Sequence, residues 1–257
     1  MASGMYAHDR HEQIVELVRA DGRVDVTTLA SRFEVTSETI RRDLTALERR
    51  GLVRRVHGGA IPIERLGFEP PLATRDTVMT AEKDRIAKAA LDEVPDEGAI
   101  LLDAGSTTSR FADILPADRE LTVVTHALNI AVALARRPNL TVLTLGGRVR
   151  GRTLAAVDVW SVNALADIFV DVAFMATNGI SVERGLTTPD PTEAAVKRAM
   201  CASARRVVLL ADHTKVGNDH LVRFAGIEEV DTFITDGGLD PELAAELEAT
   251  DLRVIRS

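Results

Sequence analysis

The spacing of apolar residues differs between the two ends of the chain. Over residues 8–52 apolar side chains recur every three or four positions, as on one face of a helix. Over residues 99–255 short apolar runs rich in valine, leucine and isoleucine alternate with amphipathic segments. The first pattern predicts a small helical module. The second predicts a parallel sheet whose strands are covered on both faces.

The segment Val35–Leu52 predicts a helix with an apolar back and an arginine-rich front. Ile40, Leu44 and Leu47 fall on one stripe at helical spacing. The opposite side carries the polar and basic residues Glu38, Arg42, Thr45 and Arg49, and Arg41 lies at its edge. A helix of this kind suits the major groove of DNA, although an arginine-rich face can also be only a solvated surface.

Two shorter helices and a hairpin are predicted around this segment. The helices cover residues 8–20 and 25–33, with Asp25 as a candidate cap, and a three-residue turn leads to the third helix, which a hydroxyl of Thr36 or Ser37 can cap. Alternation over residues 52–56, followed by a glycine pair, predicts a wing that places Arg54 and Arg55 against the DNA backbone or minor groove. Together these elements predict a winged helix-turn-helix domain over residues 5–60.

Four residues that break regular structure predict a linker over residues 61–79: Pro62, Gly67, Pro70 and Pro71. The remaining residues, 80–257, alternate between predicted strands and helices. The strands are expected over residues 99–102, 121–124, 140–145, 172–175, 207–210, 232–234 and 252–255. The helices are expected over residues 83–94, 107–115, 127–136, 157–168, 193–204 and 241–249. This order predicts an α/β fold with an open, mostly parallel Rossmann-like sheet and helices on both faces.

Ligands of such sheets bind beyond the carboxyl ends of the strands, and small, hydroxyl and charged residues follow five of the predicted strands. They are Asp103, Gly105, Ser106, Thr107, Thr108, Thr125, His126, Gly146, Gly147, Arg148, Asn178, Thr187, Asp212 and Lys215. Small residues at a helix start let backbone N–H groups gather around an anion. Lys197 is a further candidate, although Glu193 and Lys197 also have the spacing of a surface ion pair. The convergence predicts a site for a phosphorylated small molecule.

Charge and composition narrow the function. The net charge is −8, yet residues 41–57 hold 6 arginines against 2 acidic residues, so positive charge is concentrated around the predicted DNA-facing helix. The single cysteine, Cys201, lies in an apolar stretch and predicts a buried, inert thiol. The sequence shows neither a secretory signal nor an apolar run of about 20 residues, which predicts a cytoplasmic protein. The histidines lack metal-ligand spacing and no catalytic constellation is visible, so no metal, cofactor or catalytic residue is expected.

The basic helix and the hairpin also carry a family resemblance. The run Thr36–Leu44, followed by Leu47-Glu48 and by Gly51–Ala60, resembles the N-terminal signature of DeoR/GlpR-type bacterial transcriptional regulators. The resemblance implies a repressor whose Ser37, Thr39, Arg41 and Arg42 approach DNA, and we add His57 of the wing to the candidates. Asp43, which lies among the arginines, is interpreted as the structural partner of an arginine.

The strand-end residues of the second region resemble the effector domain of the same family, which is similar in fold to ribose-5-phosphate isomerase and glucosamine-6-phosphate deaminase. The resemblance implies a sugar phosphate as inducer. The chain reads Thr125-His126-Ala127 where the family often has Thr-Asn-Ser. It also reads Ala176–Ile180 where the isomerases carry an acidic run. Because enolisation of a sugar needs a carboxylate base, this difference predicts binding without turnover.

These observations favour a repressor of a carbohydrate-metabolism operon that binds operator double-stranded DNA and a phosphorylated sugar. A symmetric operator implies a homo-oligomer, dimer or tetramer, with helices of the α/β domain as the interface. Two alternatives remain open at this point. One is a sugar-phosphate isomerase or deaminase with a DNA-binding appendage. The other is a constitutive DNA-binding protein with an empty α/β oligomerisation domain.

Overall fold

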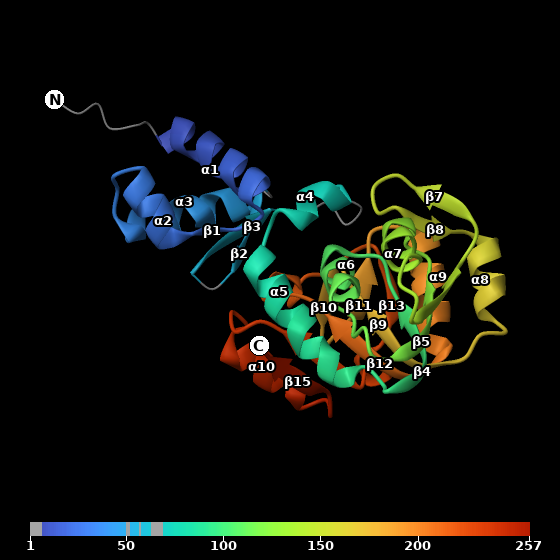
Figure 1. Ribbon diagram of the computed structural model, residues 1–257. Helices are drawn as coiled ribbons and strands as arrows, with labels where there is room; N and C mark the ends of the chain where they lie inside the picture. Colours follow the sequence, from blue (N-terminus) through green and yellow to red (C-terminus); the bar gives the residue numbers. More distant parts are fainter. Residues whose placement is uncertain (1–6, 50–51, 57, 63–68) are drawn as a thin grey trace. The chain divides into compact units, whose positions relative to one another are not determined.

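The structure, a computed structural model, describes residues 7–49, 52–56, 58–62 and 69–257. The chain divides into two compact units, a first unit of residues 1–65 and a second unit of residues 66–257 (Figure 1). Each unit has its own hydrophobic core.

The first unit is a three-helix module with a small antiparallel sheet. Its elements are α1 (Ala7–Asp21), β1 (Val24–Asp25), α2 (Val26–Arg32), α3 (Ser37–Arg49), β2 (Val53–Val56) and β3 (Gly59–Pro62). The strands lie in the order β1-β3-β2, and β2 and β3 form the predicted wing hairpin. Ile40, Leu44 and Leu47 are buried, which confirms the apolar stripe of the predicted DNA-facing helix.

One predicted helix cap is confirmed and another is wrong. The backbone N–H of Thr39 donates to Oγ1 of Thr36 over 3.2 Å, so Thr36 caps α3. Asp25 precedes α2, but its side chain makes no capping hydrogen bond. The N–H of Val26 donates instead to the carbonyl oxygen of Gly58 in the wing, 2.8 Å away. A long-range backbone bond has therefore taken the place of the local cap.

The second unit is built on a seven-stranded parallel sheet in the order β15-β14-β12-β9-β4-β5-β6. Its strands are β4 (Glu97–Leu102), β5 (Glu120–Thr125), β6 (Leu140–Thr144), β9 (Val170–Met175), β12 (Ala204–Leu210), β14 (Thr232–Thr235) and β15 (Arg253–Arg256). From β4 the chain runs to one edge through β5 and β6, and from β9 it runs to the other edge. The order therefore reverses between β4 and β9, and a crevice opens beyond the carboxyl ends of strands at such a point.

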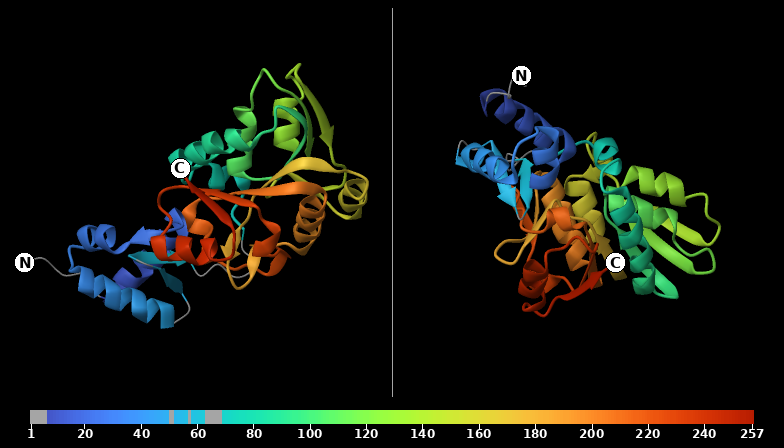
Figure 2. Two further views of the ribbon diagram at one scale, coloured as in Figure 1. Left: turned by 90° about the horizontal axis from the view of Figure 1, so that it is seen from below. Right: turned by 90° about the vertical axis from the view of Figure 1, so that its left-hand side faces the viewer.

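Helices cover both faces of this sheet, as predicted (Figure 2). They are α5 (Thr80–Ala89), α6 (Ser106–Asp113), α7 (Leu128–Leu134), α8 (Val159–Leu165), α9 (Pro191–Ala202) and α10 (Pro241–Glu248), with short 3-10 turns η1 (Ala90–Glu93), η2 (His213–Lys215) and η3 (Ile227–Glu229). Ile86, Phe111 and Ile130 of α5, α6 and α7 pack on one face, and Leu165 and Met200 of α8 and α9 on the other.

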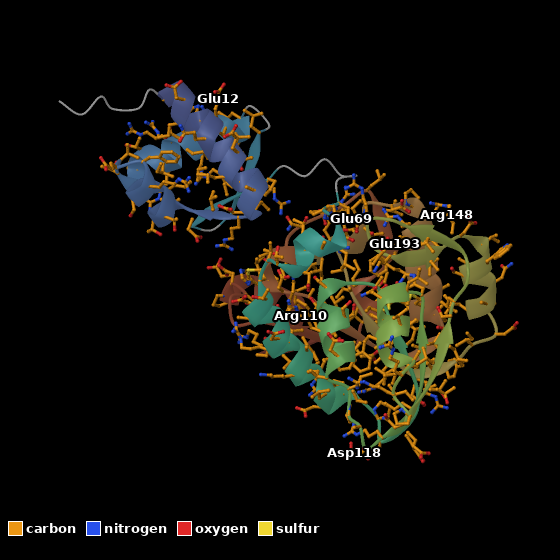
Figure 3. The ribbon with its side chains drawn as sticks, turned by 45° about the horizontal axis from the view of Figure 1, so that its top comes forward. Glu12, Glu69, Arg110, Asp118, Arg148 and Glu193 are labelled. Carbon is orange, nitrogen blue, oxygen red and sulfur yellow. The ribbon has the colours of Figure 1, made fainter. Side chains whose placement is uncertain are left out.

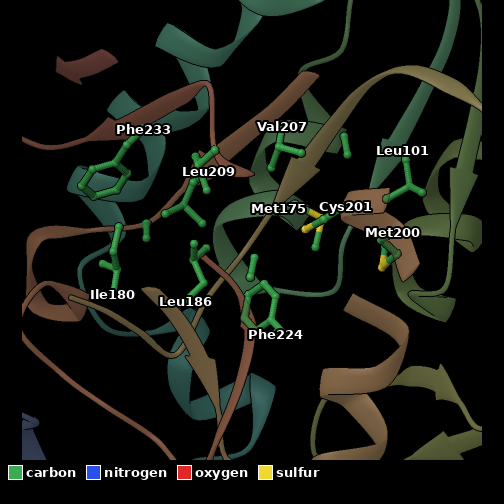
Figure 4. Packing of buried hydrophobic residues seen from close by; sticks show 14 of the residues in the cluster. Leu101, Met175, Ile180, Leu186, Met200, Cys201, Val207, Leu209, Phe224 and Phe233 are labelled. Atoms are coloured by element: carbon green, nitrogen blue, oxygen red, sulfur yellow. The ribbon is translucent and has the colours of Figure 1, made fainter. Parts of the chain in front are cut away.

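Cys201 lies on the core-facing side of α9, beside Met175 and Met200 (Figure 4). Burial raises the pKa of its thiol to about 12, so the thiol stays protonated and inert at neutral pH. The sequence prediction of a buried thiol is confirmed.

The sequence pattern did not predict several short strands. They are the hairpin β7 (Arg148–Arg150) and β8 (Ala155–Val157), and the antiparallel sheet of β10 (Gly179–Ser181), β11 (Gly185–Thr188) and β13 (Val222–Ala225). The helix predicted over 157–168 was wrong at its start, because Val157 ends β8 and Asp158 caps α8. Strands of three or four residues are too short to show a period, and only their tertiary pairing defines them.

Residues 61–79 were predicted as a linker, but both described parts of that segment contain regular structure. Ile61 and Pro62 complete β3. Residues 72–76 form the helix α4 (Leu72–Asp76), and its first N–H, from Leu72, donates to the carbonyl oxygen of Arg152 over 2.7 Å. The proline pair Pro70-Pro71 stands at the start of this helix, where proline is tolerated, rather than breaking it.

Candidate DNA-binding and effector sites

The front of α3 is exposed as the sequence predicted. The side chains of Arg41 and Arg42 are 57% and 81% exposed, and both guanidinium groups approach the exposed carboxylate of Glu38, at 3.7 and 3.6 Å. Surface ion pairs of this kind contribute little to stability, so both arginines can exchange Glu38 for a phosphate or a base edge at small cost. Ser37 and Thr39 lie half-buried in the first turn of the same helix, and Arg49 is exposed in its last turn.

Two of the predicted DNA contacts join the wing to α3. Nη1 of Arg55 in β2 donates to Oγ1 of Thr45 over 3.0 Å, and the Arg55 N–H donates to Oε1 of Glu48 over 2.9 Å. The Thr45 hydroxyl in turn donates to the carbonyl oxygen of Arg41. These bonds orient the wing relative to the exposed front of α3. Arg54 is half-buried in β2, and the predicted contact His57 lies outside the described residues.

Asp43 is buried and binds an arginine, which confirms its interpretation as a structural residue. Its carboxylate accepts from Nε and Nη2 of Arg10 over 2.6 and 3.2 Å, and lies 2.9 Å from Nε2 of His11. The hydrogen bond to Asp43 raises the pKa of Arg10. The partner comes from α1 rather than from the neighbouring arginines of α3. The sequence showed no periodic signal for this pair, because it depends on how α1 crosses α3.

In the second unit, a buried charged cluster stands where the strand order reverses. Asp103, which follows β4, is fully buried and accepts from the N–H groups of Ala104 and Ala176 and from Nε2 of His126, over 2.8, 2.8 and 2.9 Å. Its other charge partner is Nζ of Lys197 on α9. Burial by itself raises the pKa of Asp103, but the ammonium of Lys197 and the bond to His126 lower it to about 2. The cluster joins β4, β5, β9 and α9.

Several predicted effector contacts are consequently engaged inside the protein. Lys197 also donates to the carbonyl oxygen of Ala176. Nδ1 of His126 lies 3.0 Å from the carbonyl oxygen of Ala156. Thr125 donates to the carbonyl oxygen of Leu102 over 2.7 Å. Glu193 and Lys197 are both buried, so the interpretation of that pair as a surface ion pair was wrong.

The first turn of α6 is a candidate place for an anion. Gly105 precedes the helix, and Ser106, Thr107 and Thr108 form its buried first turn. The N–H groups of a first helical turn have no partner within the helix and point along its axis. A side chain at Gly105 would place Cβ 3.0 Å from the side chain of Ala176, so glycine allows α6 to begin close to the end of β9.

Four cationic side chains of the second unit, one each from α4, α5, α6 and η2, lie near enough to influence one another. Lys83 of α5 is 4% exposed, and its ammonium donates to the carbonyl oxygens of Arg75 and Val78. Burial lowers the pKa of Lys83 to about 8. Asp212 opposes this shift, whereas Lys215, Arg110 and Arg75 add to it. The arginines of this group also have acidic partners, since Arg110 pairs with Asp76 and Asp84 and Arg75 approaches Glu69.

Hydrogen-bond donors in the same cluster are also unused. Nε and Nη2 of Arg75 and Nε of Arg110 are buried without a hydrogen-bond partner among the described residues, although Nη2 of Arg75 lies 3.7 Å from the carboxylate of Glu69. The sequence prediction included Lys215 but missed Lys83, Arg75 and Arg110. A signal existed for Lys83, because it shares a helical stripe with Ile86, Ala87 and Ala90, where a lysine is unusual.

A second buried network surrounds Glu69, only a few residues after the end of the first unit. Its carboxylate lies 3.0 Å from Nη1 of Arg150 in β7 and accepts from Nδ2 of Asn178 over 3.2 Å. Arg150 also pairs with Glu193 and, over 3.2 Å, with Asp190. Figure 3 shows Glu69 and Glu193 close together, although they come from distant parts of the second unit's sequence. Burial lowers the pKa of Arg150, but the nearby carboxylates raise it by more, so the pKa of Arg150 is raised overall.

The remaining predicted residues shape the rim. Gly147 has a φ of +142° and lies so close to the carbonyl oxygen of Val157 that a Cβ would clash. Nη2 of Arg148 reaches the Thr192 hydroxyl over 3.4 Å, Thr187 accepts from the N–H of His220, and Asp212 caps η2. Gly146 accepts a hydrogen bond from Ser161 through its carbonyl oxygen.

A groove of about 450 Å³ lies on the outer side of α6, between α4, α7 and the β7–β8 hairpin. Its lining includes Leu72, Ser106, Arg110, Asn129 and Arg152. Oδ1 of Asn129 is buried without a hydrogen-bond partner among the described residues. Polar groups from α6 and its neighbours therefore line the groove.

The described residues hold no group of three or more side chains with the potential to bind a metal ion. Within the same residues, no helix is long and apolar enough to cross a membrane. The segment after β9, where an isomerase would carry its acidic run, contains Thr177 and Asn178. Both are engaged, Thr177 with the carbonyl oxygens of Gly179 and Thr187 and Asn178 with Glu69.

Both units match known protein families. Residues 10–65 match the DeoR-like helix-turn-helix domain, and residues 78–237 match the DeoR C terminal sensor domain. The HTH-type transcriptional regulator GlpR of Haloferax volcanii is 38% identical over 252 residues, which cover 98% of each chain. The glycerol-3-phosphate regulon repressor of Escherichia coli K12 is 31% identical over 227 residues, covering 88% of this chain and 90% of the relative.

The similarity to solved structures is more distant. Ribose 5-phosphate isomerase A from Methanocaldococcus jannaschii has 17% identity and a TM-score of 0.40, covering 54% of this chain and 55% of that chain. Similarity at that level says nothing of activity. The family matches over both units, by contrast, agree with the exposed basic helix, its wing and the open α/β sheet. The chain therefore belongs to the DeoR family of helix-turn-helix transcriptional regulators, and it is a DNA-binding regulator rather than an enzyme.

Proposed function

We propose that this regulator represses a carbohydrate-metabolism operon and that a phosphorylated sugar, bound in the second unit, controls its contact with operator DNA. The observation that carries the proposal is the group of Arg75, Lys83, Arg110 and Lys215, whose positive charge and unused N–H groups lie in the same unit as the open first turn of α6. Among the relatives, the names of the Escherichia coli glycerol-3-phosphate regulon repressor and of a putative aga operon repressor support the assignment to carbohydrate metabolism.

In the proposed complex the phosphoryl oxygens accept from the N–H groups of Ser106, Thr107 and Thr108, and the ammonium groups of Lys83 and Lys215 balance their charge. Hydrogen bonds to charged groups contribute about 1.5–3 kcal/mol each, so losing one lysine weakens binding by about 10- to 100-fold. The sugar hydroxyls extend along the rim toward Asn178 and Arg148. Lys197 and His126 contribute by fixing Asp103 rather than by touching the ligand.

The signal leaves the pocket, in this proposal, through the segment that begins at Glu69. Arg75 on α4 is a phosphate ligand, and Glu69 holds Arg150 and Asn178 of the rim. A bound anion attracts the same guanidinium groups that Glu69 now holds, so it favours a different placement of residues 69–76. Because this segment leads directly from the first unit, its displacement shifts the population of DNA-competent conformations.

The same proposal assigns DNA contact to Ser37, Thr39, Arg41, Arg42 and Arg49 on the front of α3, with Arg54, Arg55 and His57 contributing from the wing. A symmetric operator then requires a homo-oligomer, because each copy presents one recognition helix to one half-site.

Effector binding is tested by thermal unfolding of the full chain with a panel of phosphorylated sugars, together with a gel shift on DNA from upstream of its own gene. A ligand that binds the folded state raises the melting temperature. We expect one sugar phosphate to do so and to change the gel shift, while the unphosphorylated sugar does neither. Lys215→Glu should abolish both effects, and Lys88→Glu, an equal charge change at an exposed site of α5, should preserve them. Operator binding without response to any sugar phosphate would favour a constitutive DNA-binding protein.

A further inference from the structure

One side of the second unit exposes large apolar side chains from three neighbouring elements. Leu143 of β6, Val149 of β7 and Val159 of α8 are 46%, 43% and 56% exposed, and Trp160 of α8 is 73% exposed. Figure 1 shows α8 and the β7–β8 hairpin next to each other on this side of the unit. We call the four residues together the β6–α8 surface.

Contacts of Ser161 and Gly147 hold the parts of the β6–α8 surface close to one another. The hydroxyl of Ser161, in the first turn of α8, donates to the carbonyl oxygen of Gly146 just beyond β6, over 2.6 Å. Gly147 fits against the carbonyl oxygen of Val157, which a Cβ would approach to 2.3 Å. The start of α8 is therefore attached to the chain that leaves β6, and β7 follows directly from the same point. The four exposed residues therefore lie on elements that are packed against one another and form one surface.

The sequence around the β6–α8 surface has the composition of a protein interface. No glutamate or lysine occurs between Glu120 and Glu183, although the chain as a whole is 27% charged. Lysine and glutamate are depleted at interfaces, whereas tryptophan and arginine are enriched. Two arginines of this stretch are half-buried, with Arg137 donating to the carbonyl oxygens of Leu115 and Asp113 and Arg150 pairing with Glu69 and Glu193. The other three, Arg136, Arg148 and Arg152, are exposed.

The surface also includes an open sheet edge. In the described part of the second unit β6 pairs with β5 and has no strand on its other side. Natural proteins protect such edges with lysine, proline or a bulge, because an unpaired row of N–H and C=O groups recruits another strand. Leu140–Thr144 contains no lysine and no proline, and its pairing with β5 is regular throughout. An edge of this kind is typical of a strand that another chain covers.

We propose that the β6–α8 surface binds the same surface of a second copy of this chain about a two-fold axis, with the two β6 edges facing each other. A two-fold contact brings each group near its own copy, so a charged residue close to the axis would repel itself. The exposed charges next to the surface are of both signs, Arg148 beside Val149 and Asp158 beside Val159, so the arginine of one copy has an aspartate of the other copy as a possible partner. A different partner protein would face no such restriction and would be matched by opposite charge on its own surface.

The size of the surface suits this occupant. The four side chains expose about 400 Å² of mainly apolar area per chain, given their exposed fractions and the areas of such residues. A stable interface buries about 800 Å² per partner, of which about 55–65% is non-polar. The backbone and polar side chains of β6 and the flanks of α7 and α8 supply the remainder.

Trp160 is the only tryptophan of the chain, so its fluorescence reports on this surface without any mutation. We expect the full-length protein at micromolar concentration to show blue-shifted emission and weak quenching by acrylamide. On dilution, emission should shift to the red and quenching should strengthen together with a fall in mass measured by light scattering. Red emission and strong quenching at every concentration would overturn the proposal.

Substitution at the surface gives the second arm of the test. Trp160→Glu and, separately, Leu143→Lys should at least halve the mass measured by sedimentation equilibrium, while circular dichroism and melting in the diluted state stay unchanged. Leu221→Glu, at a site that is 56% exposed but outside the surface, is the matched control and should keep the wild-type mass. Unchanged mass in both surface variants, or a monomeric wild type, would contradict a self-association through this surface. These readouts require neither operator nor sugar phosphate, so they are independent of the proposed function.

Discussion

Lys83 offers the sharpest test of the proposed anion site, because its buried charge costs stability in the absence of ligand. Its pKa falls from 10.5 to about 8 on folding, mainly through burial. A shift of that size corresponds to about 3 kcal/mol by which the charged ammonium destabilises the folded state at neutral pH. Natural proteins keep such a cost at sites where the charge serves binding.

Replacing Lys83 by methionine removes this cost but leaves the carbonyl oxygens of Arg75 and Val78 without their donor. Each lost bond to a buried carbonyl costs about 1 kcal/mol, so we expect Lys83→Met to be more stable than the wild type by about 1 kcal/mol at pH 7. The same variant should lose response to every phosphorylated sugar. A variant that is more stable than the wild type but no longer binds the ligand identifies Lys83 as a binding residue rather than a structural one.

The pH dependence isolates the charge itself. Between pH 8 and pH 10.5 the unfolded chain holds the Lys83 proton and the folded chain does not, so the stability of the wild type rises with pH in that window. Urea unfolding should therefore show the wild type gaining about 3 kcal/mol relative to Lys83→Met from pH 8 to pH 10.5. A constant difference between the two proteins across this range would refute the reasoning. Lys88→Met, at an exposed position of the same helix, is the control.

Three further outcomes are expected. Affinity for the sugar phosphate, measured by calorimetry, should fall about tenfold per pH unit above pH 8 as free Lys83 loses its proton, and a flat profile would remove Lys83 from the site. Arg42→Ala should lose operator binding in a gel shift yet keep sugar-phosphate binding, whereas Arg85→Ala on α5 should change neither. Asp43→Ala should destabilise the first unit by about 3–5 kcal/mol in chemical unfolding, because it removes the carboxylate from a buried ion pair with Arg10. Adding Arg10→Met should restore part of that loss. If the unfolding free energies of the two single variants simply add in the double variant, the pairing of Asp43 with Arg10 is contradicted.

Much of the architecture could be predicted from local pattern. The stripe of Ile40, Leu44 and Leu47 specified α3, since apolar residues at helical spacing have only one way to bury a common face. Runs such as Val207–Leu210 specified central strands of a parallel sheet, because continuous apolar residues require cover on both faces. The exposed arginines of α3 followed from the same periodicity, and the basic front of this helix could therefore be predicted from the amino-acid sequence alone.

The tertiary structure decided which polar residues meet. Asp103 and Lys197 are far apart in sequence and each resembles an ordinary strand end or surface helix residue. Only the placement of β4 beside β9 makes them a buried pair that is engaged inside the protein. Lys83 and Arg75 belong to a helix and a predicted linker, yet the ammonium of Lys83 donates to the carbonyl oxygen of Arg75. Spacing along one element is a local property of the sequence, whereas burial and charge pairing depend on which elements pack together.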